Sequence, residues 1–194
     1  VSRLCSDYLE PLGCTDTGKI LGEFHDFGKY SDSFQQVLAG TMHGVDHASG
    51  GAMFLDIISK GRPSYRPVIE AINGHHDGLV GFDGDMVENY ANAGKKAALS
   101  KEEYAAANSA FRSDFPDFSP KLDTAPPKNE LEKMLFTRML FSCLVDADYT
   151  CSARNDDAEY FEYAENLVFD ADELLNRLYC YRDEMRKGKA DSEL

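Results

Sequence analysis

Apolar side chains recur at helical spacing along most of this chain, and no stretch shows convincing alternation with a period of two residues. The first example is Val1, Leu4, Tyr8 and Leu9, which precede Gly13 as a stop signal. A helix buries one stripe of its surface, whereas a strand buries every second residue. The pattern therefore predicts an all-α fold, built as a bundle of helices.

Capping residues and glycines set the expected boundaries. Thr15 or Asp16 is expected to cap the second helix, Ser31 or Asp32 the third, and Asp46 the fourth. Residues 40–45 are expected to form a loop. The expected helices cover roughly residues 1–13, 15–28, 31–37, 47–59, 65–76, 130–148 and 156–187.

Residues 78–129 differ from the rest of the chain. They contain several glycines, four prolines and a weakly apolar helix candidate at 101–114, which predicts a loop-rich insertion. The following segment, 130–148, is apolar around most of its circumference and is expected to be central to the fold. The length of 194 residues favours one domain over residues 1–194.

The net charge of −14 argues against a surface that coats nucleic acid, because affinity for phosphates comes mainly from Lys and Arg. Bound divalent metals would invert the sign locally, so a phosphate substrate remains compatible. No apolar run approaches the roughly 18 residues that a membrane span needs. The five scattered cysteines contain no Cys-x-x-Cys pair and fit a reducing cytoplasm, so we expect a cytoplasmic protein without a membrane partner.

All five histidines lie within the first 76 residues, and most of them belong to short motifs. His25-Asp26 is expected at the end of a helix, His47 at the start of the next, and His75-His76 at the end of another. Asp148 follows far downstream. Imidazoles and carboxylates suit divalent manganese, iron, nickel, cobalt or magnesium. Neighbouring residues on a helix diverge by about 100°, so each pair can reach two points around a metal pair.

Each element alone has a plainer explanation. The His75-His76 pair is also compatible with a solvated helix end, and Asp148 with a surface carboxylate. We interpret His43 as a non-ligand because Gly44 argues against a helix that would join it to His47. The order of the whole set is what favours a metal site able to hydrolyse a phosphate ester.

These motifs resemble the HD phosphohydrolase superfamily and, more narrowly, the HD nuclease domain of the CRISPR type I nuclease–helicase. The resemblance rests on residues 21–35, 45–52, 72–79 and 142–149. Its most specific parts are Lys29 and the Phe34-Gln35 pair after His25-Asp26, together with the string that begins at His75. It implies an HD-domain helical bundle.

The resemblance implies up to two metal positions. One would use His25, Asp26 and Asp148, and the other would use Asp26, His47, His75 and His76, with Asp26 as the bridge. Asp146 competes with Asp148, which matches the family's last ligand better. Lys29 and Asp26 would be the catalytic residues, with Lys29 on a phosphate oxygen; the alternative for Lys29 is a salt bridge to a nearby carboxylate.

The family carries a further metal-binding histidine on its first helix, and residues 1–18 contain none. We therefore expect a domain truncated at its N-terminus, with its helicase on a separate chain or a removed C-terminal part, since no Gly-x-x-x-x-Gly-Lys-Ser/Thr loop is present. The implied function is endo- or exonucleolytic cleavage of single-stranded DNA in CRISPR antiviral defence. The implied partners are single-stranded DNA, a helicase and the crRNA-guided surveillance complex.

Two other hypotheses remain open at this stage. One is an HD-type enzyme that acts on a nucleotide or a cyclic nucleotide. The other is a weakly metal-binding module that docks on its motor or on the surveillance complex and has no catalytic role.

Overall fold

The computed structural model describes residues 1–79, 101–125, 127–156 and 170–190, and within these ranges it contains helices and no β-strand. The all-α prediction is confirmed. The chain divides into two compact units, Val1–Ser152 and Ala153–Leu194, and every candidate metal ligand lies in the first. None of the helices in the described ranges is both long and apolar enough to cross a bilayer.

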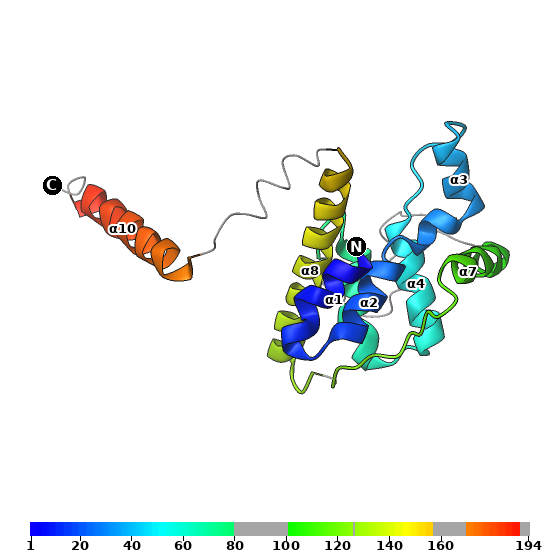
Figure 1. Cartoon of the computed structure of the whole chain (residues 1–194), viewed down its shortest axis with the longest axis horizontal. Coiled ribbons are helices and arrows are strands. Elements are labelled where there is room, and N and C mark those ends of the chain that lie inside the picture. Colours follow the sequence, from blue (N-terminus) through cyan, green and yellow to red (C-terminus); the bar gives the residue numbers. More distant parts are fainter. Residues whose placement is uncertain (80–100, 126, 157–169, 191–194) are drawn as a thin grey trace. The chain divides into compact units, whose positions relative to one another are not determined.

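The first unit is built from α-helices and short 3-10 helices (Figure 1). Gly13 adopts the left-handed conformation predicted for a stop after the first helix, with φ of 68°. In chain order the elements are α1 (Ser2–Leu9), η1 (Glu10–Leu12), α2 (Thr15–Phe24), η2 (Phe27–Tyr30), α3 (Asp32–Leu38), α4 (Ala48–Ser59), η3 (Pro63–Tyr65), α5 (Arg66–Gly74), α7 (Lys101–Asp114) and α8 (Glu130–Asp156).

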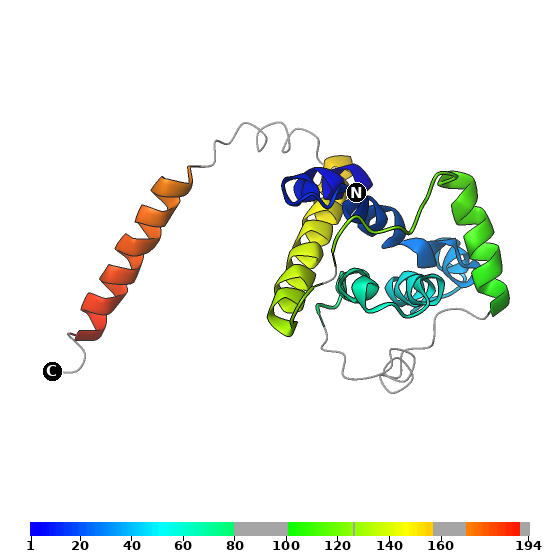
Figure 2. The same ribbon diagram turned by 90° about the horizontal axis from the view of Figure 1, so that it is seen from below.

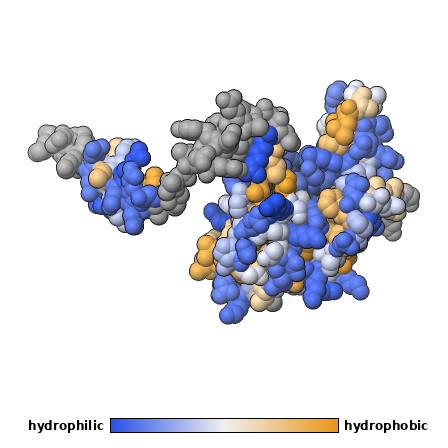
Figure 3. All heavy atoms as spheres, in the orientation of Figure 1, coloured by the Kyte–Doolittle hydropathy of each residue, from blue (hydrophilic) through white to orange (hydrophobic). Residues whose placement is uncertain are grey.

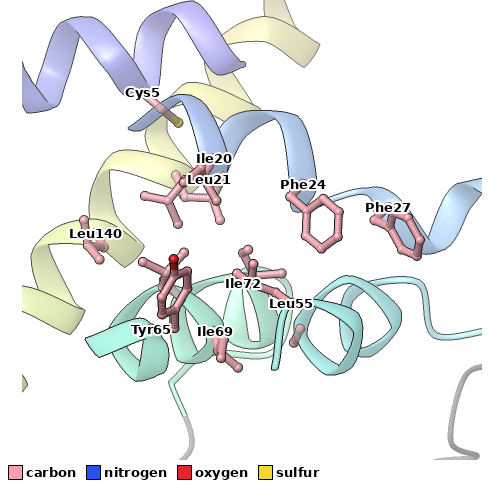
Figure 4. Packing of buried hydrophobic residues seen from close by; sticks show 14 of the residues in the cluster. Cys5, Ile20, Leu21, Phe24, Phe27, Leu55, Tyr65, Ile69, Ile72 and Leu140 are labelled. Carbon is pink, nitrogen blue, oxygen red and sulfur yellow. The ribbon is translucent and has the colours of Figure 1, made fainter. Parts of the chain in front are cut away.

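Helix α2 is the centre of the core. Its Ile20, Leu21 and Phe24 point towards α5 and α4, which lie below it in Figure 4. Leu140 approaches the same cluster from α8, and Cys5 from α1. Removal of this apolar surface from water is the main stabilising term for the unit. Since α2 ends at Phe24, the packing of this helix in the core also fixes the positions of His25 and Asp26, which follow it.

Two glycines on one face of α2 allow α1 to pack closely against it. A Cβ at Gly18 would collide with the backbone of Cys5, and one at Gly22 with the backbone of Ser2. Residues four apart lie on the same side of a helix, so the two glycines form a flat strip. The close approach of the α1 backbone to α2 therefore depends on glycine at positions 18 and 22.

The cap of α2 comes from a distant residue, and the expectation that Thr15 or Asp16 would cap it was wrong. Asp123 accepts hydrogen bonds from the backbone N–H groups of Asp16 and Thr17, at 2.7 and 3.0 Å, and from the Thr17 hydroxyl at 2.6 Å. A carboxylate at a helix N-terminus satisfies donors that lack intrahelical partners. Ser31 caps α3 as predicted, since its Oγ accepts from the N–H of Phe34. The expected N-cap of the fourth helix was wrong by one residue, because His47 occupies the N-cap position of α4. Asp46 Oδ1 still accepts from the N–H groups of Ala48 and Ser49, at 3.0 and 3.3 Å.

Residues 80–100 and 126 of the expected 78–129 insertion lie outside the described residues. The described part is more than an excursion, because α7 packs on η2 (Figure 2). Phe111 and Ala107 of this helix are fully buried. Phe118, after the helix, is also buried against Phe24, with ring centroids 5.2 Å apart. The weak apolar signal of α7 arises because only one narrow stripe of it enters the core.

The expectation that the 130–148 helix is central was wrong. Helix α8 extends to Asp156, and Leu140, Leu144 and Ala147 bury one face of it. Its opposite face leaves Leu131 and Leu135 exposed, by 63% and 56%. Apolar residues around the circumference show that a helix can be buried, but not how many neighbours it has.

The second unit contains α10 (Ala171–Ala190) among its described residues. The expected final helix over 156–187 agrees with the structure in this part, while residues 157–169 lie outside the described ranges. On the face shown in Figure 3, much of the described surface is polar and hydrophobic residues form small separate patches.

Candidate metal centre

The predicted ligands lie where helices begin and end. His25 is the residue that follows α2, Asp26 precedes η2, His47 precedes α4, and His75 follows α5. Asp148 projects from within α8. The fold thus brings together side chains separated by more than 120 positions in the sequence, which is the arrangement that a metal site built from several helices requires.

Close packing at Gly28 sets the distance between two of these elements. A Cβ at this position would collide with the backbone of His47. The η2 turn can therefore approach the start of α4 only because residue 28 is glycine. This contact places Asp26 Oδ1 at 3.3 Å from His47 Nε2.

Backbone carbonyls orient the two most buried histidines. His25 Nδ1 donates to the carbonyl oxygen of Gly22 at 3.0 Å, and His75 Nδ1 donates to that of Ile72 at 2.6 Å. Both rings are only 4% exposed. Since Nδ1 carries the proton in each neutral ring, Nε2 is left as the lone-pair donor. A hydrogen bond from the second ring nitrogen to a carbonyl is typical of metal-binding histidines.

Several buried polar atoms at this point have no hydrogen-bond partner within the described ranges. They are His25 Nε2, His75 Nε2 and Asp26 Oδ1. His25 Nε2 lies 3.2 Å from Asp26 Oδ2 and 3.5 Å from Asp148 Oδ1, but neither approach has the geometry of a hydrogen bond. Leaving buried polar atoms unsatisfied costs on the order of 1–3 kcal/mol each. A cation among them would remove that cost.

The ligand atoms form two overlapping groups, with all atoms of a group within 4.8 Å of one another. Among the described residues, one group is Asp26, His47, His75 and His76, and the other is His25, His75 and Asp148. His47 Nε2 and His76 Nε2 are 2.8 Å apart. Two nitrogens bound to one metal at about 2.1 Å lie roughly 3 Å apart, so the spacing fits a shared ion.

The first group contains the four residues expected for the second metal position. The second group differs from the expected His25, Asp26 and Asp148, since it contains His75 instead of Asp26. His75 has one free nitrogen and can bind one ion, whereas the two oxygens of Asp26 face different neighbours. Oδ1 is near His47 and Oδ2 is near His25, at 3.3 and 3.2 Å. Asp26 is therefore the residue whose geometry suits a bridge.

The structure also places the residues whose roles the sequence left open. Asp148 Oδ1 faces His25, while Asp146 is exposed on another side of α8 and belongs to neither ligand group. His43 is exposed in the non-helical segment before α4 and is likewise outside both groups. Lys29 Nζ lies 2.7 Å from Asp26 Oδ2, so the salt bridge weighed as its alternative role is present.

Burial and charge act in opposite directions on the acidic centre. Burial favours the neutral form of Asp26, but the nearby rings of His25 and His47 and the ammonium group of Lys29 outweigh it and hold the pKa of Asp26 well below its usual range. Burial would lower the pKa of His25, yet the carboxylates of Asp148 and Asp26 raise it to about 9. Burial lowers the pKa of His75 to about 4, supported by the charges of His76 and His25.

The donor set fits a divalent transition metal. It offers neutral imidazole nitrogens and carboxylate oxygens without a thiolate, which suits manganese, iron, cobalt or nickel, and zinc equally on ligand type alone. The residues that would hold it are His25, Asp26, His47, His75, His76 and Asp148. The capacity for a metal ion is thus a property of the described structure, while the identity of the ion is not fixed by these ligands.

Metal binding is expected to release a proton at neutral pH. With a pKa of about 9, His25 is protonated at pH 7 in the metal-free protein, whereas His75, with a pKa of about 4, is already neutral. A metal binds only the neutral ring, so we expect about one proton released per chain at pH 7, fading as the pH rises through the pKa of His25.

Calorimetric titration with manganese in buffers of different ionisation enthalpy measures this release. His25→Gln is the matched variant and should release fewer protons than the wild-type chain at pH 7. Equal metal affinity and no proton release between pH 6 and pH 9 would contradict the assignment of His25 as a ligand.

Sequence reasoning missed the parts of the site that are not motif side chains. The carbonyls of Gly22 and Ile72 carry no signal in residue type, although a position three residues before a terminal histidine is a general place to look. It also missed Glu23, Tyr30 and Phe115, which line a pocket beside His25 and Asp26. Comparison of the chain with family models, curated proteins and solved structures gives no match.

Proposed function

We propose that this chain is a divalent-metal-dependent phosphohydrolase that cleaves phosphodiester bonds of single-stranded DNA. The observation that carries the proposal is the convergence of six imidazole and carboxylate side chains from five positions in the fold, with buried Nε2 atoms left unpaired. The resemblance to HD nuclease domains narrows the substrate to a DNA strand and supplies the link to CRISPR defence in the cytoplasm.

The protein residues have separable tasks in this proposal. His47, His75, His76 and Asp26 would hold one ion, and His25, Asp26 and Asp148 would hold a second. When bound, divalent ions supply positive charge for the phosphate oxygens and acidify a water molecule that serves as the nucleophile. Lys29 exchanges its contact with Asp26 for a phosphate oxygen, which its half-exposed side chain can reach by rotation.

The strong negative charge of the chain constrains how a strand is held. With 34 acidic and 20 basic residues, the general surface repels a phosphate backbone. A helicase subunit or domain and the crRNA-guided surveillance complex would therefore bind the DNA strand. This domain would contribute the metal ions. Weak binding of long DNA by the isolated chain is the corresponding expectation.

A substrate panel tests the proposal. The manganese-, nickel-, cobalt- or iron-loaded protein is incubated with single-stranded and duplex oligonucleotides, nucleoside phosphates and cyclic nucleotides. We expect cleavage of the single strand, lost on chelation and restored by added metal. Preferential hydrolysis of a nucleotide or cyclic nucleotide would favour the other enzymatic hypothesis. No hydrolysis, with one ion or none bound, would favour the docking module.

A further inference from the structure

A pocket of about 330 Å³ opens directly beside the candidate metal centre. His25 and Asp26 belong to both, so a phosphate group held at the metals would lie beside this pocket. The remaining wall is formed by Gly22, Glu23, Lys29, Tyr30, Gln35 and Phe115. Small-molecule sites begin at about 300 Å³, which is large enough for one nucleotide unit and too small for a folded polymer.

Two aromatic rings of this wall are held in place from behind by one buried residue. Phe115 stacks on Phe111 with ring centroids 4.9 Å apart, and Tyr30 meets Phe111 edge-on at 5.7 Å. Phe111 itself is fully buried. The Tyr30 hydroxyl also donates to Asp114 at 2.6 Å. The aromatic wall is therefore largely preformed, so little conformational entropy is lost when a flat ligand packs on it.

The polar part of the wall offers hydrogen-bond acceptors. Gln35 Nε2 donates to the backbone carbonyl of Lys29 at 2.7 Å, which fixes the orientation of the amide. In the described ranges its Oε1 has no hydrogen-bond partner. The Glu23 carboxylate is only 10% exposed and lies 3.8 Å from Lys19 Nζ. Acceptors beside an aromatic wall suit a planar ring that carries N–H donors.

We propose that this pocket is a nucleobase subsite, which holds the base of the nucleotide unit whose phosphate lies at the metal centre. The base packs on Phe115 and Tyr30, and its amino group donates to Gln35 Oε1. This inference rests on the proposed function, because it takes the phosphate position from the metal ligands. The shared chemistry is one nucleotide unit, either free or within a strand.

The test compares a nucleotide with its base-free counterpart. Deoxycytidine 5′-monophosphate and 2-deoxyribose 5-phosphate are titrated separately into the manganese-loaded full chain, and hydrolysis of a single-stranded deoxycytidine oligonucleotide is followed in parallel. A stacked and hydrogen-bonded base is expected to improve the dissociation constant by about tenfold or more. Equal affinity of the two compounds would overturn the inference.

Matched variants locate the base within the protein. Phe115→Leu and Gln35→Ala are expected to remove most of the advantage of the nucleotide while leaving manganese affinity unchanged. The controls are Phe136→Leu, another partly buried phenylalanine packed on the core but outside the pocket, and Gln36→Ala, the neighbour on α3. An undiminished advantage in both pocket variants would contradict the assignment even if the wild-type preference is present.

A third titration identifies the source of the nucleotide. A deoxycytidine hexanucleotide that displaces the monophosphate supports a strand as the occupant, whereas a hexanucleotide that fails to displace it supports a free nucleotide. The two proposals fail in different ways. Base-dependent binding without any hydrolysis would support the nucleobase subsite and contradict the proposed function. Metal-dependent hydrolysis with base-independent binding would support the proposed function and contradict the subsite.

Discussion

Asp26→Asn is expected to lower metal-dependent hydrolysis by more than about 100-fold, a loss beyond that typical of residues that merely support metal ligands. Asp26 is the one described residue whose two oxygens face different histidines, His47 and His25. The asparagine side chain has the same shape but no negative charge. Its amide nitrogen, which replaces one carboxylate oxygen, cannot coordinate a metal ion. Initial rates on the preferred substrate of the panel, at saturating manganese, measure the effect.

Asp146→Asn is the matched control for this change. It removes the same charge from an exposed position on α8, two residues before a proposed ligand, and should leave the rate within about twofold because exposed charges contribute little. Thermal unfolding of both variants distinguishes loss of chemistry from loss of structure. A folded Asp26→Asn variant with wild-type rate would remove Asp26 from the catalytic machinery.

Phe24→Ala is expected to destabilise the first unit by about 3–5 kcal/mol, the usual cost of removing a buried aromatic ring. Phe24 is fully buried and contacts the rings of Phe27, Phe111 and Phe118, with centroids 4.7 to 5.2 Å away. It is also the last residue of α2, immediately before His25. Part of the metal affinity should therefore be lost along with stability.

Denaturant titration of the metal-free chain measures this free energy. Tyr149→Ala removes a ring of similar size that is 69% exposed, and it should change the free energy of unfolding by less than about 0.5 kcal/mol. The metal-loaded Phe24→Ala variant should regain part of its stability, since ions that bind the folded state shift the equilibrium towards it. Equal stability of the two variants would show that the aromatic cluster is not the core of this unit.

The helices and the candidate ligands follow closely from local sequence signals. Helical spacing predicted α1 to α5, and the same reasoning placed His25, His47 and His75 at helix ends, where the structure has them. These signals are local because a stripe or a cap depends on residues within one or two turns. That side chains from four separate places in the sequence meet is a tertiary fact. The order of the motifs suggested a shared site, and the resemblance to a known arrangement assigned the ligands to it.

Long-range partners account for what the sequence did not reveal. Asp123 caps a helix that begins more than 100 residues earlier, and nothing in residue type or spacing marks that pairing. Phe111 lies in a weakly apolar segment, yet it anchors the wall of the pocket beside the metal centre. Helix α8 is the opposite case, because it has an apolar face that stays exposed. Hydrophobicity favours burial but does not specify which element will cover a face.

The metal centre itself is tested most directly by counting bound ions. The full chain is equilibrated with manganese, separated from free metal by gel filtration and analysed for metal per mole of protein, beside Asp26→Asn and the exposed-site variant His43→Gln. One to two ions should remain on the wild-type chain and on His43→Gln, and fewer on Asp26→Asn. Absence of bound manganese from the folded wild-type chain, with cobalt and nickel equally absent, would contradict the account.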